Sequence, residues 1–164
     1  MTRVAVALCL ALGFLVSHGC ASGGTSLSDA HASAIRDSVS AAMTAFQRHS
    51  TAAQWDSLAR LYSPSSAFRF LESGAIQYTS SAAVRAALAE VPAGMHITTD
   101  YRDLQIDPVG PGAAMVTALF ETTFADSAGP RFRFGGALSL LWTHEADGWR
   151  IRSGHSSAPV PRGG

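Results

Sequence analysis

Residues 96–157 read HITTDYRDLQIDPVGPGAAMVTALFETTFADSAGPRFRFGGALSLLWTHEADGWRIRSGHSS. Long runs rich in β-branched and aromatic residues fill this stretch: His96–Asp107, Ala113–Asp126, Arg131–Glu145 and Trp149–Ser157. Turn signals built from Pro, Gly, Asp and Ser separate the runs. Because consecutive strands joined by short loops pair antiparallel, the stretch predicts a meander of four long strands.

The residues before the meander change to helical periodicity. Ile35, Val39, Met43 and Phe46 recur at intervals of four, four and three, which predicts an amphipathic helix beginning at about Ser28. A Thr51–Gln54 capping box predicts the start of a second helix, which Pro64 stops. Short strands are predicted at Ala67–Leu71 and Ile76–Tyr78. Apolar spacing predicts a third helix from about Ser80 to Pro92.

This order of elements predicts the α+β class, with three N-terminal helices packed on one face of a curved antiparallel sheet. The length of 164 residues is that of one domain, and a hydrophobic content of 47% is enough for one core. We expect the domain to span residues 29–157, followed by a disordered tail at residues 158–164, where two prolines and two glycines occur.

The first 28 residues have the pattern of an export signal and a tether. Arg3 precedes the uncharged apolar run Val4–Val16, which is too short to span a membrane as a helix and is typical of a signal peptide. The run ends at Cys20, in a context similar to a bacterial lipobox, so residues 1–20 predict a lipoprotein signal and residues 21–28 a flexible tether. The alternative is ordinary cleavage just after Cys20. Both interpretations predict export to a bacterial cell envelope, as an anchored lipoprotein or a periplasmic protein.

Charge and cysteine content exclude several classes of protein. Lys and Arg total 12 against 12 Asp and Glu, so the chain has no basic excess for binding nucleic acid. Cys9 lies in the apolar signal run, which leaves Cys20 without a disulfide partner.

His144-Glu145 begins like a zinc motif, but Gly148 stands where the second histidine is needed, so we expect no metal site and no cofactor.

Several segments in this order resemble one known superfamily: Trp55–Tyr62, Gly74–Leu88, Asp147–Ile151 and His155–Ser157. The chain is similar to the nuclear transport factor 2-like superfamily, and in detail to its SnoaL-like and related secreted members. The resemblance implies a cone-shaped α+β barrel whose helices and sheet enclose a pocket. The superfamily includes isomerases, dehydratases and non-catalytic members, so the fold alone does not decide the function.

The last strand supplies the main candidate for the pocket. Strict alternation places Trp149, Ile151 and His155 on one side, which we take as the concave one because it carries the large apolar groups. We expect Tyr78, Tyr101, His155 and Trp149 to line a pocket for a small hydrophobic molecule. In the alternative, His155 only ties the core together through a hydrogen bond to Tyr78, Tyr101 or a backbone carbonyl.

No evident catalytic set emerges from the sequence. When the pattern of the superfamily's steroid isomerases is laid on the chain, the general base falls on Leu71, and Glu72 would point to the opposite face of that strand. The alternative is an isomerase, dehydratase or hydrolase that uses His155 with Glu121 or Glu72. Glu121 is either a rim charge paired with an arginine, Arg131 or Arg133, or an acid in the pocket.

The third strand of the meander suggests an association surface. Phe132, Phe134, Leu138, Leu140 and Trp142 share one parity, and we expect the sheet face that lacks helices to be apolar. Members of the superfamily that the chain resembles often dimerise through this sheet, so we expect a homodimer.

Overall fold

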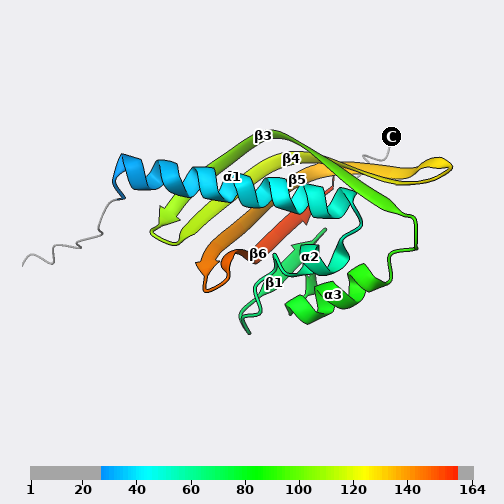
Figure 1. Ribbon diagram of the computed structural model, residues 1–164, viewed down its shortest axis with the longest axis horizontal. Coiled ribbons are helices and arrows are strands. Elements are labelled where there is room, and N and C mark those ends of the chain that lie inside the picture. The colour runs from blue at the N-terminus through cyan, green and yellow to red at the C-terminus, as the bar shows by residue number, and fades with distance from the viewer. Residues whose placement is uncertain (1–26, 159–164) are drawn as a thin grey trace, which may run out of the picture.

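Three helices lie along one side of a curved sheet in the structure, a computed structural model that describes residues 27–158 (Figure 1). The helices are α1 (Asp29–Thr51), α2 (Trp55–Ala59) and α3 (Ser81–Ala89). The strands are β1 (Arg69–Glu72), β2 (Ala75–Tyr78), β3 (His96–Gly110), β4 (Ala113–Asp126), β5 (Gly129–Glu145) and β6 (Gly148–Ser157). This arrangement confirms the predicted α+β class. The predicted signal, the tether as far as residue 26 and most of the tail lie outside the described residues.

All six strands form one sheet in the order β2-β1-β6-β5-β4-β3. Strands β3 to β6 are the predicted antiparallel meander. The sequence did not predict that β1 joins β6 in parallel, with Leu71 opposite His155 and Glu72 opposite Ser156. The sheet is therefore mixed and stays open between its edge strands β2 and β3, so it forms a cone wall that is not a closed barrel.

Side-chain caps begin two of the helices. The Ser28 hydroxyl accepts a hydrogen bond from the His31 backbone N–H at the start of α1, and Ser80 does the same for Ala83 at α3. The predicted Thr51–Gln54 capping box is wrong, because Thr51 ends α1 and Gln54 makes no capping bond to α2. Among the described residues, no helix has the length and apolar content that a membrane span needs.

The core forms where α1 packs on the concave face of the sheet. The predicted stripe of Ile35, Val39 and Met43 is buried there, and Trp142 and Ile151 of the sheet are 0% and 1% exposed. These side chains make one cluster, in which burial of each large apolar group contributes roughly 1.5–3 kcal/mol. Because this cluster lies under the N-terminal two thirds of α1, it leaves the far end of the concave face free for a cavity.

From Phe134 to Trp142 the apolar parity of β5 lies on the side of the sheet that the helices cover, whereas Phe132, farther along the hairpin on the same side, is 52% exposed. Leu140 and Trp142 are buried in the core, and Phe134 and Leu138 lie on the same concave side. The expectation that this parity forms an uncovered apolar face is therefore wrong. The opposite, convex face is mixed, with polar and charged residues such as Glu121 and Arg133 beside the apolar Met115, Leu119 and Leu141. The homodimer itself stays a prediction.

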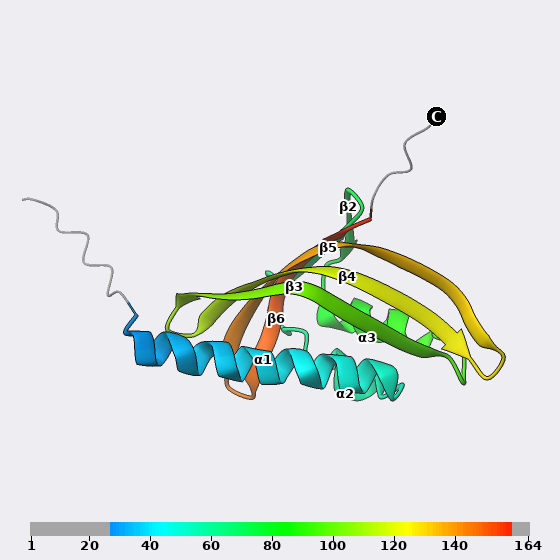
Figure 2. The same ribbon diagram turned by 90° about the horizontal axis from the view of Figure 1, so that it is seen from above.

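The β4–β5 hairpin bends over the concave side and projects past the ends of α1 and α3 (Figure 2). Two glycines of β5 lie at the bend. A Cβ atom on Gly135 would approach the Phe120 carbonyl oxygen to 2.8 Å, and one on Gly136 would overlap the Ser157 carbonyl oxygen. Only glycine fits at these positions, so the close approach of β5 to its neighbours requires both.

Gly154→Ala tests how tightly β6 packs against β1. The added methyl group would meet the Phe70 ring and come within 2.9 Å of Leu140 Cδ2, so we expect a loss of about 1–3 kcal/mol in the free energy of unfolding. Urea denaturation measures it. Gly112→Ala, whose Cβ would lie 3.7 Å from His144 Cβ, is the control and should unfold as the wild type does. Equal stability of both variants would contradict the packing described here.

Candidate functional site

A cavity of about 210 Å³ lies between the concave face of the sheet and the helices. Phe46 and Ser50 of α1, Leu58 of α2 and Leu88 of α3 form its helical side. Most of the sheet side is apolar: Phe70, Phe120, Phe134, Leu138, Leu140 and Ile151. An apolar cavity of roughly 150 Å³ holds a benzene ring, so this one accepts a single ring with a short substituent.

A larger depression of about 730 Å³ lies on the convex face and has a different character. Arg102, Glu121 and the two glycines of the β5 bend line it. It is an open groove whose Glu121 carboxylate already has a partner, because Arg133 Nη1 lies 3.4 Å from its Oε1. The concave cavity is lined mainly by apolar side chains and contains phenolic hydroxyl groups without protein partners, which makes it the better candidate.

Tyr62 is held in the cavity by the backbone and by aromatic neighbours. The residues on either side of it bond to β6: Ile151 N–H donates to the Leu61 carbonyl at 2.7 Å, and Ser63 N–H donates to the Ile151 carbonyl at 2.9 Å. Its ring packs edge-on against Phe46, Phe68 and Phe70, with centroids 5.9–6.4 Å apart. This support fixes where the phenolic hydroxyl lies.

Tyr101 enters the same cavity from β3, opposite Phe120 of β4. Burial raises the pKa of the Tyr101 hydroxyl above its usual value of 10.0. Burial also raises the pKa of Tyr62, and the nearby Tyr101, Tyr78 and Glu72 raise it further. Both phenols are therefore protonated at neutral pH and can donate hydrogen bonds. Neither hydroxyl makes a hydrogen bond to residues 27–158, and neither is sealed from solvent, because the buried side-chain polar atom without a partner in that part of the chain is Trp142 Nε1.

Glu72 adds a carboxylate to this pair of donors. It follows Phe70 by two residues on β1, so strand alternation places both side chains on the cavity side. Ser156, which lies opposite Glu72 in the parallel β1–β6 pair, lines the cavity as well. The isomerase pattern pointed to Leu71, and the structure brings in its neighbour Glu72 instead.

Three other hydroxyl groups of the cavity, those of Ser50, Thr99 and Thr122, bond within the protein. Ser50 Oγ donates to the Ile97 carbonyl at 2.9 Å, and the Thr99 and Thr122 hydroxyl groups lie 2.9 Å apart. These bonds attach α1 to β3 and β3 to β4. A ligand would therefore find its free donors in Tyr62 and Tyr101 and not in these side chains.

His155 does not line the cavity, contrary to the expectation from strict alternation. Trp142 pairs with Ile151 while its neighbour Leu141 pairs with Ser153, so Arg152 is the extra residue of a β-bulge. The bulge reverses the parity of β6. Ile151 stays on the concave side, whereas His155 is exposed on the convex one. The structure therefore gives it neither the predicted place in the pocket nor the alternative role within the core.

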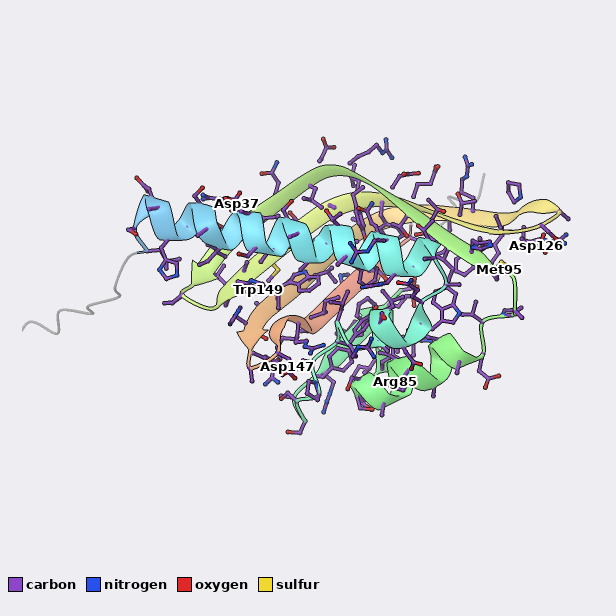
Figure 3. The ribbon with its side chains drawn as sticks, viewed as in Figure 1. Asp37, Arg85, Met95, Asp126, Asp147 and Trp149 are labelled. Carbon is purple, nitrogen blue, oxygen red and sulfur yellow. The ribbon has the colours of Figure 1, made fainter. Side chains whose placement is uncertain are left out.

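The remaining predicted residues divide between several places. Tyr78 is not among the lining residues but lies beside the cavity, opposite Phe70 in the β1–β2 pair, with the two ring centroids 6.4 Å apart. Trp149 is on the concave side but under the N-terminal half of α1, edge-on to His144 in a separate depression (Figure 3). Glu121 is a convex-face charge paired with Arg133, as one of the two alternatives predicted. His155, Glu121 and Glu72 therefore do not converge.

Sequence reasoning missed Tyr62 as a site residue. The prediction of a second helix that continues to Pro64 placed this tyrosine within a helix, whereas α2 ends at Ala59 and Tyr62 bridges to Ile151 of β6. The tyrosine two residues before Pro64 was the available signal that the helix had already ended. Across residues 27–158, no three His, Cys, Asp or Glu side chains gather closely enough to hold a metal ion.

The raised pKa values predict a loss of stability at alkaline pH. Tyrosines of the unfolded chain ionise near 10.0, below the folded values, so folding favours the protonated phenols. This contribution is fully present below about pH 10 and is lost as the pH rises further. We expect the free energy of unfolding to fall above about pH 10, and to fall less in a Tyr62→Phe, Tyr101→Phe double variant. Denaturant titrations across this pH range check it, and parallel curves for the two proteins would contradict it.

The comparisons with known proteins agree with this geometry. The SnoaL-like domain family matches residues 39–161. A nuclear transport factor 2-like superfamily protein from Salmonella enterica superimposes with a TM-score of 0.65 at 16% identity, over 80% of this chain and 95% of that one. A candidate dehydratase of the same family from Streptomyces avermitilis gives 0.64 at 19%, over 78% and 98%.

A third structure, a nuclear transport factor 2-like protein of unknown function from Shewanella oneidensis, gives a TM-score of 0.63 at 17% identity, over 75% and 98% of the two chains. No curated protein sequence shows significant similarity to the chain. At these identities the solved structures establish the fold, and the family match covers most of the chain. The protein belongs to the SnoaL-like domain family, within the nuclear transport factor 2-like superfamily.

Proposed function

We propose that the protein binds a small ring-bearing molecule in the concave cavity, with a phenolic or alcohol oxygen held by Tyr62 and Tyr101. The observation that carries this proposal is the pair of protonated phenols without protein partners in an apolar cavity. Within this largely apolar cavity the two hydroxyl groups are donors that a ligand oxygen can reach, and each such hydrogen bond contributes roughly 0.5–1.5 kcal/mol to binding.

Glu72 limits which functional group the ligand can place in the cavity. A carboxylate accepts hydrogen bonds, so the ligand oxygen that accepts from the tyrosines should also donate a proton toward Glu72. A hydroxyl group on a ring meets both requirements, whereas a carboxylate ligand would face the charge of Glu72. Aromatic side chains on several sides of the cavity favour a ring over a flexible chain in this position.

A second candidate function is proton transfer, and Glu72 is the observation that favours it. The Glu72 carboxylate, which lies near protonated Tyr62, could take a proton from carbon while the phenols of the cavity stabilise the oxyanion that forms. The Streptomyces neighbour is named as a candidate dehydratase, which is compatible with such chemistry. Under this candidate Glu72→Gln would keep ligand binding and abolish turnover.

We also propose that the protein is exported and attached to lipid through Cys20. Arg3, the apolar run Val4–Val16 and the small residues after Cys20 support this proposal. We expect the mature N-terminus to be Cys20 with a diacylglyceryl group, which mass spectrometry detects. An unmodified N-terminus beyond Cys20 would contradict the anchor and leave export standing, whereas an intact Met1 would contradict both.

Tyr62→Phe tests the binding site. We expect binding of 4-ethylphenol to weaken by about 3- to 10-fold, since one hydrogen bond contributes roughly 0.5–1.5 kcal/mol. The free energy of unfolding should change by less than about 0.5 kcal/mol, because the hydroxyl has no protein partner to lose. Titration calorimetry and urea denaturation measure the two quantities.

Tyr78→Phe is the matched control, because Tyr78 lies outside the cavity lining and its loss of a hydroxyl should leave the affinity unchanged. If both variants bind 4-ethylphenol as the wild type does, or if the wild type does not bind it, the proposed site is wrong.

A further inference from the structure

Three phenylalanine rings line the concave face of the β4–β5 hairpin beyond the cavity. Phe124 stacks on Phe132, its cross-strand partner, with ring centroids 4.2 Å apart and an angle of 14° between the planes. Phe134 lies 6.1 Å from each of them, at angles of 27° and 15°. We call Phe124, Phe132 and Phe134 the aromatic ladder.

The ladder extends into solvent. The hairpin projects past α1, whose last turn ends level with the start of β3, where His96 Nδ1 lies 3.2 Å from the Thr51 carbonyl oxygen (Figures 1 and 2). Phe132 is 52% exposed, although apolar surface in contact with water is unfavourable by roughly 25 cal/mol per Å². A partner that covers the ladder would therefore gain binding energy.

The charged side chains of the hairpin form ion pairs at its turn and on its convex face, away from the aromatic ladder. At its turn Arg131 Nε lies 2.6 Å from Asp126 Oδ2, and Asp126 lies at the tip in Figure 3. Arg133 pairs with Glu121 on the convex face. The hairpin is thus charged at its turn and on its convex face and apolar on its concave face, which favours an uncharged, apolar occupant for the ladder.

The ladder continues the cavity wall. Phe134 belongs to both, because it lines the cavity and also stacks in the ladder. It contacts Phe120, another wall residue, edge-on with centroids 5.8 Å apart. A ligand whose ring fills the 210 Å³ cavity can therefore extend past Phe134 and continue along the ladder without leaving an apolar surface.

We propose that the aromatic ladder binds the apolar tail of a ligand whose hydroxyl-bearing ring occupies the cavity. This inference rests on the proposed function and adds the class of ligand, an alkyl-substituted phenol or ring alcohol. Phe124 and Phe132 cover one face of each other, and Phe134 is offset from both, so the three rings present a continuous row of ring edges and partly free faces. An alkyl chain lies well along such a row of edges, whereas a second flat ring could stack only at the end of the row.

The test compares 4-ethylphenol with 4-hexylphenol by titration calorimetry on the full-length chain. We expect 4-hexylphenol to bind at least about tenfold more tightly, because each fully buried methylene contributes roughly a factor of four. Phe132→Ser should remove most of this difference and leave the affinity for 4-ethylphenol unchanged. That unchanged affinity also shows that the variant is folded.

Val109→Ser is the control for exposed apolar surface in general. Val109 is 56% exposed at the opposite end of β3, and its loss should leave the preference for the hexyl chain intact. If the wild type binds both phenols equally, or if the preference survives Phe132→Ser, the ladder is not a tail site although the cavity proposal stands. If neither phenol binds, the cavity proposal fails and the ladder proposal fails with it.

Discussion

The packing of α1 on the concave face of the sheet is the contact on which the other features depend. Val39 and Trp142 are fully buried where the two surfaces meet, and Ile151 joins them from β6. This cluster holds the long strands to one side of the helix and so defines the inner face of the cone. Toward the C-terminus of α1 the side chains become partly polar: Gln47 Nε2 and Ser50 Oγ donate to the Thr99 and Ile97 carbonyl oxygens of β3. The cavity lies at this C-terminal end of α1, where the apolar core ends and polar side chains bond the helix to β3.

The nature of the cavity follows from which polar groups are satisfied. Ser50 donates its hydroxyl proton to the backbone of β3, and the Thr99 and Thr122 hydroxyl groups bond to each other, whereas no such bond is made by the Tyr62 and Tyr101 hydroxyl groups. A phenol that cannot ionise at neutral pH is a neutral donor, and such a donor retains its strength because little water competes for it. In the convex groove, by contrast, the polar group is the solvent-exposed carboxylate of Glu121, which already pairs with Arg133.

Sequence periodicity predicted correctly where most helices and strands lie. It was less successful in predicting which side of the sheet individual side chains face. The stripe of α1 and the four long strands were found because each rests on a repeated local pattern of 3.6 or 2 residues. The positions of His155 and Tyr62 depend on single irregularities, a bulge at Arg152 and a backbone bridge from Tyr62 to Ile151, which leave no periodic trace. Glu72 lines the cavity because β1 pairs in parallel with β6. This is a contact between distant segments, which alternation along one strand cannot predict.

That parallel pair also has a consequence for the order of folding. β1 is made early in synthesis, but its partner β6 is the last strand of the domain, so this side of the cavity cannot form until the chain is nearly complete. The meander, by contrast, needs only neighbouring segments and can pair as it emerges. Contacts between remote segments slow folding, because the loop between them must be closed before the contact is gained. The parallel pairing of β1 with β6 is therefore the step that brings β1 and β2 into the sheet, and in a chain that ends before β6 the strand that carries Glu72 would have no partner in the meander.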